Sequence, residues 1–190
     1  MNSVVILAGG KSTRMGRDKL ELTLDGQTML ESVADKFSAE FENVYISVAN
    51  TEKYPHIKQR KIADILMGAG PLSGLHAALS EVEDEGVFLV AADLPYADPL
   101  TAKSIIALCR EKEICIIRLQ DGRLEPLFGY YKKTLLHRCE GAILAGKYRM
   151  KDIVLASDTR FVAPAQLGKL WDERMIINVN YPEDYDKLKL

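Results

Sequence analysis

The stretch between residues 9 and 19 joins two adjacent glycines to several cationic side chains. Gly9 and Gly10 let the backbone turn sharply and approach a ligand closely. Consecutive backbone N–H groups in such a turn form an anion-binding concavity, and Lys11, Arg14 and Lys19 add positive charge around it. This combination is suited to a nucleoside triphosphate, whose charge needs several donors at once. A glycine-rich surface turn with scattered charges is the alternative.

Two better-known glycine motifs do not fit this stretch. Gly10-Lys11-Ser12 looks like the end of a P-loop, but that motif needs a further glycine where this chain has Val5. The dinucleotide fingerprint, Gly-x-Gly-x-x-Gly, is not matched either. The missing fingerprint disfavours a Rossmann oxidoreductase.

Two aspartates follow predicted strands. Asp93 comes directly after the most apolar run of the chain, residues 86–92, where a carboxylate can hold Mg²⁺ together with substrate phosphates; a helix N-cap is the alternative. Asp64 could accept two hydrogen bonds side by side, from the adjacent N1–H and N2–H₂ donors of guanine, which cytosine and uracil lack. Asp64 could equally cap a turn.

Lys19 and Arg14 would neutralise phosphate oxygens as charge builds on a departing pyrophosphate, although solvated surface positions are the default for such residues. No Ser/His/Asp or Cys/His arrangement is visible around His56, His76 and His137. A phosphate monoester is already an anionic nucleophile and needs no general base. Positioning and charge neutralisation can therefore supply most of the catalysis.

Alternating strands and helices must position these residues. We expect strands at residues 4–6, 44–48, 61–65 and 86–92, with the last as a central parallel strand buried on both faces. Residues 20–24 read as a short strand or arm. Thr28 and Glu31 form a capping box before a helix that ends near Glu40, and further helices begin after the 68–75 loop and at Pro99.

The second half of the chain reads as a hairpin, at 114–119 and 124–131, followed by a helix at 134–144 and a short helix after the basic 146–149 turn. Late strands are expected at 161–163 and 175–180, and a final helix at 181–190. The fold class is α/β: a doubly wound, Rossmann-like, mostly parallel mixed sheet with helices on both faces. We expect a single domain over 1–190, with 1–110 for the nucleotide and 111–190 for the acceptor.

The composition of the chain limits the kinds of partner and the cellular location that we expect. The 190 residues carry a net charge of −2, which implies no bulk attraction to nucleic acid or to an anionic membrane. Three cysteines at spacings unlike a zinc site indicate reduced thiols in a cytosolic chain. No signal peptide and no membrane-length apolar run are visible, so a cytoplasmic location is expected.

The pattern L-A-G-G-x-S-x-R-M-G-x-D-K resembles the signature loop of the nucleotidyltransferases of nucleotide-diphospho-sugar transferase type, and most of all the molybdenum cofactor guanylyltransferases. The resemblance extends to Asp64, to the 70–74 and 93–96 segments, to Glu125-Pro126 and to the Asn-Val-Asn segment at 178–180. Tyr181 stands where the family has threonine. The family can also carry an asparagine where this chain has Val48, so Asn50 receives no role.

The resemblance implies transfer of GMP from GTP to the phosphate of Mo-molybdopterin, with Mg²⁺ required and pyrophosphate released. It also implies transient contact with molybdopterin-supplying or molybdoenzyme-maturation proteins. Residues 146–149 either add cationic contacts to the pterin phosphate or form a solvated turn. By the same resemblance, Lys19 and Asp93 are catalytic, Asp93 also holds the metal, and Asn178 and Asn180 lie towards the pterin. Arg14 is expected as a further catalytic residue because of its charge. The residues expected along GTP are Leu7, Ala8, Gly9, Gly10, Lys19, Asp64 and Asp93.

Two other functions remain open. A sibling enzyme could use CTP with molybdopterin or another small phosphate, but such relatives tend to read L-A-A-G where this chain has Ala8-Gly9-Gly10. The 70–72 loop and the Asp18-Lys19 pair also favour guanine. A non-catalytic nucleotide-binding protein on the same fold is disfavoured by Lys19 and Asp93, because binding alone needs no metal aspartate. Fold alone does not separate these readings.

Overall fold

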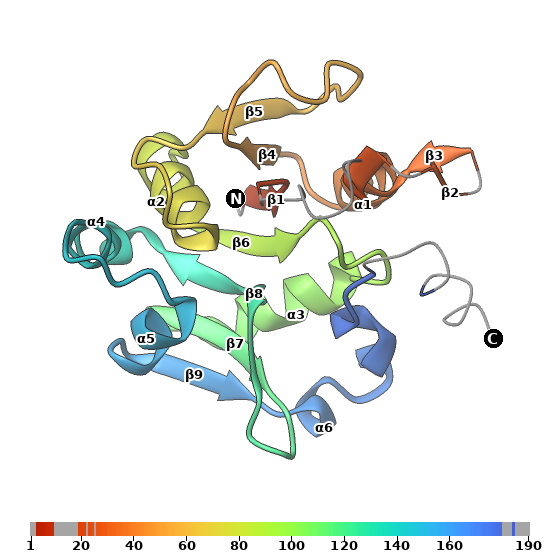
Figure 1. Cartoon of the computed structure of the whole chain (residues 1–190). Coiled ribbons are helices and arrows are strands. Elements are labelled where there is room, and N and C mark those ends of the chain that lie inside the picture. Colours follow the sequence, from red (N-terminus) through yellow and green to blue (C-terminus); the bar gives the residue numbers. More distant parts are fainter. Residues whose placement is uncertain (1–2, 10–18, 22, 25, 180–183, 185–190) are drawn as a thin grey trace.

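The computed structural model describes residues 3–9, 19–21, 23–24, 26–179 and 184. Its centre is a mixed sheet with the strand order β5-β4-β1-β6-β8-β7-β9 (Figure 1). The strands are β1 (Ser3–Leu7), β4 (Val44–Val48), β5 (Arg60–Ala63), β6 (Gly86–Ala91), β7 (Ile114–Arg118), β8 (Leu124–Lys132) and β9 (Thr159–Val162).

Every strand of this sheet except β8 runs in the same direction. The pairs β1–β4, β1–β6, β4–β5 and β7–β9 are parallel, whereas β8 is antiparallel to both of its neighbours, β6 and β7. The predicted mostly parallel mixed sheet is thus confirmed. The strand at 86–92 is central and buried as predicted, but it is parallel on its β1 side only, because the returning strand of the hairpin inserts on the other side.

Helices cover both faces of the sheet, which confirms the doubly wound arrangement (Figure 1). Helices α1 (Met29–Ser38) and α3 (Pro99–Cys109) pack on one face, around side chains such as Ile6 and Phe88. Helices α2 (Pro71–Glu81), α4 (Leu136–Leu144) and α5 (Met150–Leu155) pack on the other, around Val5 and Leu89. The alternating side chains of each strand therefore feed two separate cores.

Helix α1 begins as the sequence predicts. The Thr28 hydroxyl accepts a hydrogen bond from the Glu31 N–H at 3.2 Å, and the Glu31 carboxylate accepts one from the Thr28 N–H at 2.8 Å. This reciprocal capping satisfies two N–H groups that the helix itself leaves unpaired. The helix ends at Ser38, slightly before the predicted Glu40.

One predicted strand is shorter than expected, and another is wrong. Residues 20–24 form a 3₁₀ turn, η2 (Lys19–Glu21), and then the short strand β2 (Thr23–Leu24), which pairs with β3 (Gln27–Thr28) outside the main sheet. Residues 175–180 were expected as a late strand, but η5 (Glu173–Ile176) is a 3₁₀ turn. The Asp172 carboxylate caps that turn by accepting from the Arg174 N–H at 2.9 Å, a local bond that competes with extended pairing.

After β9 the chain forms the short helix α6 (Pro164–Leu167) and the 3₁₀ turn η4 (Gly168–Leu170). Another 3₁₀ turn, η3 (Lys133–Leu135), precedes α4. The predicted final helix at 181–190 lies outside the described residues apart from Asp184. The three cysteines are free and buried, as expected for reduced thiols.

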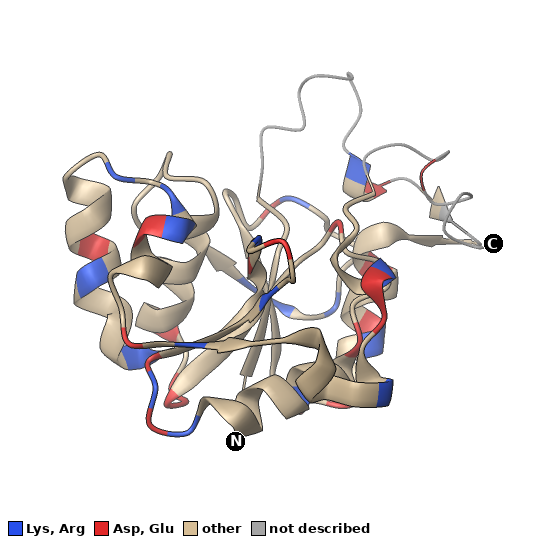
Figure 2. Ribbon diagram, turned by 90° about the horizontal axis from the view of Figure 1, so that it is seen from below, with Lys and Arg blue, Asp and Glu red and all other residues tan. Residues whose placement is uncertain are grey.

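The charged residues are spread over the outside. Figure 2 shows acidic and basic residues interspersed on the helices and connecting loops. No helix in the described part of the chain combines the length and hydropathy that a membrane span requires.

Candidate active site

The glycine-rich stretch that the sequence predicts to bind phosphate begins at the carboxyl edge of the sheet, directly after β1. The Ala92 N–H donates to the Leu7 carbonyl at 3.1 Å, and the Ala8 N–H donates to the Ser47 carbonyl at 2.9 Å. Leu7 and Ala8 are buried, whereas Gly9 is exposed. The neighbouring strands therefore fix the backbone up to the point where the chain emerges. Gly10, Lys11 and Arg14 lie outside the described residues.

Lys19 and Asp93 meet at this edge. The Lys19 Nζ lies 2.7 Å from Asp93 Oδ2, although the two residues are 74 positions apart in the sequence. The Lys19 side chain is 27% exposed and that of Asp93 is 17% exposed. Asp93 follows β6 and Lys19 opens η2, so the fold gathers a cation and a carboxylate in one largely sheltered position. A charge-assisted pair of this kind is ready to exchange partners with an incoming phosphate or metal ion.

Asp64 follows β5 at the other end of the same edge. Its backbone N–H donates to the Val48 carbonyl at 3.1 Å, which continues the β4–β5 pairing by one residue. Burial raises the pKa of the Asp64 carboxyl to about 6. Among the residues that the structure describes, none donates a hydrogen bond to this carboxylate, so turn capping does not account for it. Its acceptor oxygens are therefore not engaged by the described part of the chain.

The 68–75 loop is held against the same edge. Gly70 has φ +60°, in the region that favours glycine, and the Ala69 N–H donates to the Ser73 hydroxyl at 3.0 Å. Helix α2 starts at Pro71, as predicted, and Gly74 lies so close to β1 and β4 that a Cβ there would stand 2.5 Å from Ser47 Oγ. The first turns of α2 are thus packed tightly against Leu7 of β1 and Ser47 of β4.

The Asn-Val-Asn segment reaches Asp93 from the other half of the chain. The Val179 N–H donates to the Asp93 carbonyl at 2.9 Å, which places exposed Asn178 close to the turn that follows β6. The Arg174 guanidinium lies over the Tyr96 ring at 5.4 Å from the ring centre. Two contacts therefore join the 172–179 segment to the loop after β6. Asn180 lies outside the described residues.

A divalent cation at this edge would depend on Asp93. The described residues contain no cluster of three or more His, Cys, Asp or Glu side chains that could hold a metal ion. One carboxylate at the end of a buried strand is the donor set that suits Mg²⁺ when substrate phosphates complete the coordination. The residues present thus fit a metal that arrives with a nucleotide.

Comparisons with known proteins identify the family of this chain. Residues 4–161 match the family model described as the MobA-like NTP transferase domain. The chain belongs to this family. It is 32% identical over 187 residues to the "Probable molybdenum cofactor guanylyltransferase" of Pelotomaculum thermopropionicum, covering 98% of this chain and 91% of that protein. The resemblance predicted from the sequence is confirmed, and this MobA-like transferase is a nucleotidyltransferase of the molybdenum cofactor guanylyltransferase type.

Solved structures show the same fold. Molybdopterin-guanine dinucleotide biosynthesis protein A from Archaeoglobus fulgidus superposes with a TM-score of 0.83 at 23% identity, covering 97% of this MobA-like transferase and 95% of that chain. The Rv0371C protein of Mycobacterium tuberculosis, solved as a complex with manganese, superposes with a TM-score of 0.66 at 20% identity, covering 98% and 96% of the two chains.

The sequence did not predict one feature of this region, a cavity beside the 119–123 turn. Its lining comes from several short segments and matches no motif. The one residue in the sequence that could have pointed to this cavity is Trp171, the single tryptophan of the chain, which lies between Leu170 and Asp172.

Proposed function

We propose that this chain transfers GMP from GTP to the phosphate of Mo-molybdopterin, forming the guanine dinucleotide cofactor and pyrophosphate. The observation that carries the proposal is the 2.7 Å ion pair between Lys19 and Asp93 at the carboxyl edge. Farther along that edge lies Asp64, whose carboxylate has no hydrogen-bond partner among the described residues. Ligands of doubly wound sheets bind at this edge.

In the transfer, an oxygen of the acceptor phosphate forms a bond to the α-phosphorus of GTP. The bond from that phosphorus to the oxygen bridging to the β-phosphate breaks, and pyrophosphate leaves with the electron pair. Lys19 would exchange Asp93 for a phosphate oxygen and stabilise the charge that grows on the leaving group. Arg14 would add a second cation. Because the acceptor phosphate is already anionic, no general base is required.

Asp93 would hold Mg²⁺, which supplies charge neutralisation on the triphosphate when bound. The backbone of residues 7–10 would lie along the nucleotide, and Asn178 and Asn180 would face the acceptor. Residues 1–110 would then serve the nucleotide and 111–190 the acceptor, within one domain.

Asp64 would select the base. Its carboxylate can accept hydrogen bonds from N1–H and N2–H₂ of guanine, whereas CTP offers no such pair and would leave a half-buried carboxylate without donors. Sites built on polar pairing can discriminate by factors approaching ~10⁴.

The test is a competition among equal concentrations of GTP, ITP and CTP with Mg²⁺ and loaded molybdopterin, scored by pyrophosphate release and by the base in the product. GTP should be preferred, and ITP should fall between GTP and CTP because it keeps N1–H but lacks the 2-amino group. Preferential transfer of CMP would favour the cytidylyl alternative. Tight GTP binding without pyrophosphate release would favour a non-catalytic nucleotide-binding protein.

A further inference from the structure

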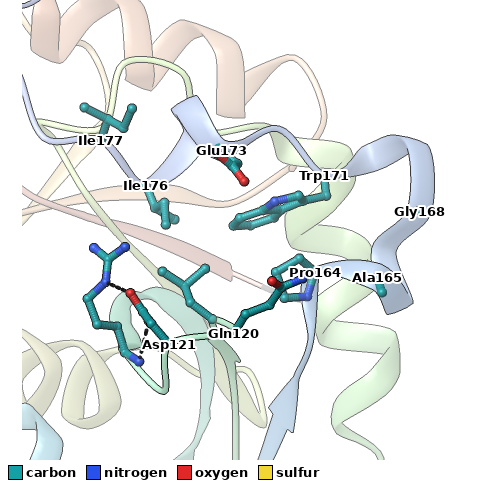
Figure 3. A pocket seen from close by; sticks show the side chains of 11 residues that line it. Gln120, Asp121, Pro164, Ala165, Gly168, Trp171, Glu173, Ile176 and Ile177 are labelled. Carbon is teal, nitrogen blue, oxygen red and sulfur yellow. Dashed lines mark hydrogen bonds and ion pairs between the residues drawn. The ribbon is translucent and has the colours of Figure 1, made fainter.

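A cavity of about 660 Å³ lies between the β7–β8 turn and the chain that follows β9 (Figure 3). Its volume falls within the range of small-molecule sites, roughly 300–1,000 Å³. Apolar walls come from Pro164, Trp171 and Ile176, and polar groups from Gln120, Asp121 and Glu173.

The cavity opens at the same edge of the sheet as the proposed GTP site. β7 and β9 run in the direction of β6, since β8 is antiparallel to both β6 and β7. The 119–123 turn and residues 163–164 therefore leave the sheet at the edge where Asp93 follows β6. In the strand order, β7 and β9 lie on the side of β6 opposite to β1, β4 and β5.

One wall of the cavity is tied to Asp93 through the backbone. Ile176 and Ile177 line the cavity, and the chain then reaches Val179, whose N–H donates to the Asp93 carbonyl. At the start of the same wall, the Thr101 hydroxyl donates to the Leu170 carbonyl at 2.6 Å, which fixes the residue before Trp171 to helix α3. The wall is thus held at both ends by the elements that flank the reaction site.

Trp171 gives the cavity an aromatic face. Its side chain is partly buried and packs against the core cluster under α3. In Figure 3 the indole ring and the Ile176 side chain both point into the cavity. A planar heterocycle between them would gain stacking on one side and apolar contact on the other.

The two carboxylates of the lining are not equivalent. Asp121 is occupied, because the Arg123 Nε donates to it at 2.7 Å and the Arg123 backbone N–H at 2.9 Å, and these bonds hold its pKa below the usual value. Glu173 has no hydrogen-bond partner among the residues that the structure describes. It lies beside Trp171 in the close-up view, with its carboxylate at the cavity.

We propose that this cavity binds the 2-amino-4-oxopyrimidine ring of the pterin acceptor, with Trp171 stacking on the ring and Glu173 accepting from its 2-amino group and N3–H. This inference rests on the function proposed above and assigns the acceptor's ring to a specific place. Guanine carries the same donor edge, but Asp64, across β6, provides a separate carboxylate for it. The two rings of the dinucleotide product would then lie on opposite sides of Asp93.

Because Trp171 is the only tryptophan and lines the cavity, its fluorescence is sensitive to a ligand bound there. Titration with pterin, corrected for absorption by the ligand, should quench the emission saturably without GTP. Lumazine, which has an oxygen in place of the 2-amino group, should bind at least ~tenfold more weakly, as expected for loss of a hydrogen bond to a charged acceptor. Glu173→Gln should weaken pterin binding and reduce this preference, whereas Lys169→Ala, an exposed neighbour outside the lining, should change neither.

Kinetics provide a second readout. Trp171→Ala should raise KM for molybdopterin at least ~tenfold and leave KM for GTP unchanged, and Trp171→Phe should restore most of the loss because it keeps an aromatic face. Absence of saturable quenching, or stronger quenching by guanosine than by pterin, would overturn the assignment. An unchanged KM for molybdopterin in Trp171→Ala would do the same. Quenching by pterin in a protein that transfers no GMP would instead refute the proposed function and leave the cavity assignment standing.

Discussion

The ionised Asp64 carboxylate should lower the stability of the folded protein at neutral pH. Its pKa in the folded chain is about 6, against a usual value of 3.8, because burial disfavours the charged form. The folded state therefore binds more protons than the unfolded state between about pH 4 and pH 6. Stability is highest below the unfolded pKa and is lost as pH rises through the folded pKa.

The size of this cost follows from the difference between the two pKa values. If the full pKa difference of about two units were converted into free energy of unfolding, the loss at neutral pH would be about 3 kcal/mol. The side chain is only half-buried, so water and salt screen part of it, and we expect about 1–2 kcal/mol. Asp64→Asn removes the charge with little change in shape and should stabilise the protein by about that amount at pH 7.5. For a chain of this length the melting temperature should rise by roughly 3–6 °C.

The assay is urea unfolding of wild type and Asp64→Asn at pH 4, 5.5 and 7.5, followed by circular dichroism. The stabilisation should shrink towards zero at pH 4, where the wild-type folded carboxyl is already protonated. Asp121→Asn is the matched control: Arg123 holds the Asp121 pKa below its usual value, so this variant should not gain stability at pH 7.5. An Asp64→Asn variant that is less stable at pH 7.5, or equally stabilised at all three pH values, would refute the reasoning.

The same variant separates stability from function. Wild-type affinity for GTP should decline as pH falls through about 6, since a protonated Asp64 cannot accept both guanine hydrogen bonds. Asp64→Asn should bind GTP at least ~tenfold more weakly even though it is more stable. Loss of both stability and affinity would point to a structural role only.

Three further variants test the rest of the site. Asp93→Asn should keep the fold and lose most activity, and near wild-type turnover at limiting Mg²⁺ would contradict its role as metal ligand. Lys19→Ala should lower the rate at saturating GTP by ~10²-fold or more while nucleotide affinity, measured by calorimetry, falls much less; an unchanged rate would remove Lys19 from the chemistry. Gly74→Ala should lower the free energy of unfolding by about 1–3 kcal/mol, because the added Cβ would stand 2.5 Å from Ser47 Oγ and 2.6 Å from Leu7 Cδ2. Its control is Gly141→Ala on α4, where no atom lies within 4 Å and the change should stabilise by up to ~1 kcal/mol; equal effects would refute the packing argument.

The sequence predicted much of the fold because the local signals agree with one another. The Thr28–Glu31 capping box, the buried run at 86–91 and the Asp121-Gly122 turn each lie where propensity and pattern place them. Both Asp64 and Asp93 directly follow predicted parallel strands, so the rule that ligands bind beyond the carboxyl ends of such strands predicts both at one edge.

The rest depended on contacts distant in sequence. Lys19 and Asp93 were each expected at the phosphates, but their direct pairing needs a tertiary contact across 74 positions. The alternation of apolar and polar residues at 20–24 predicts a strand. In the structure this segment starts with the 3₁₀ turn η2, whose first residue, Lys19, pairs with Asp93. The apolar run at 175–179 is typical of a strand, yet it begins inside the 3₁₀ turn η5 and pairs with no described strand of the sheet. Contacts of Val179 and Arg174 with the 93–96 loop hold this segment in place. The cavity beside Trp171 escaped prediction because no motif spans its separate segments.

The single reversed strand, β8, has a consequence for how this enzyme could acquire new acceptors. It divides the sheet into one parallel block, β5-β4-β1-β6, and another, β7-β9, while its own turn emerges at the shared edge. On the proposed assignment, insertions or substitutions at residues 119–123 and 164–177 would reshape the pocket for the second substrate without disturbing the strands behind the phosphates. A duplicated copy could therefore drift towards a different phosphorylated acceptor while keeping its nucleotide chemistry intact.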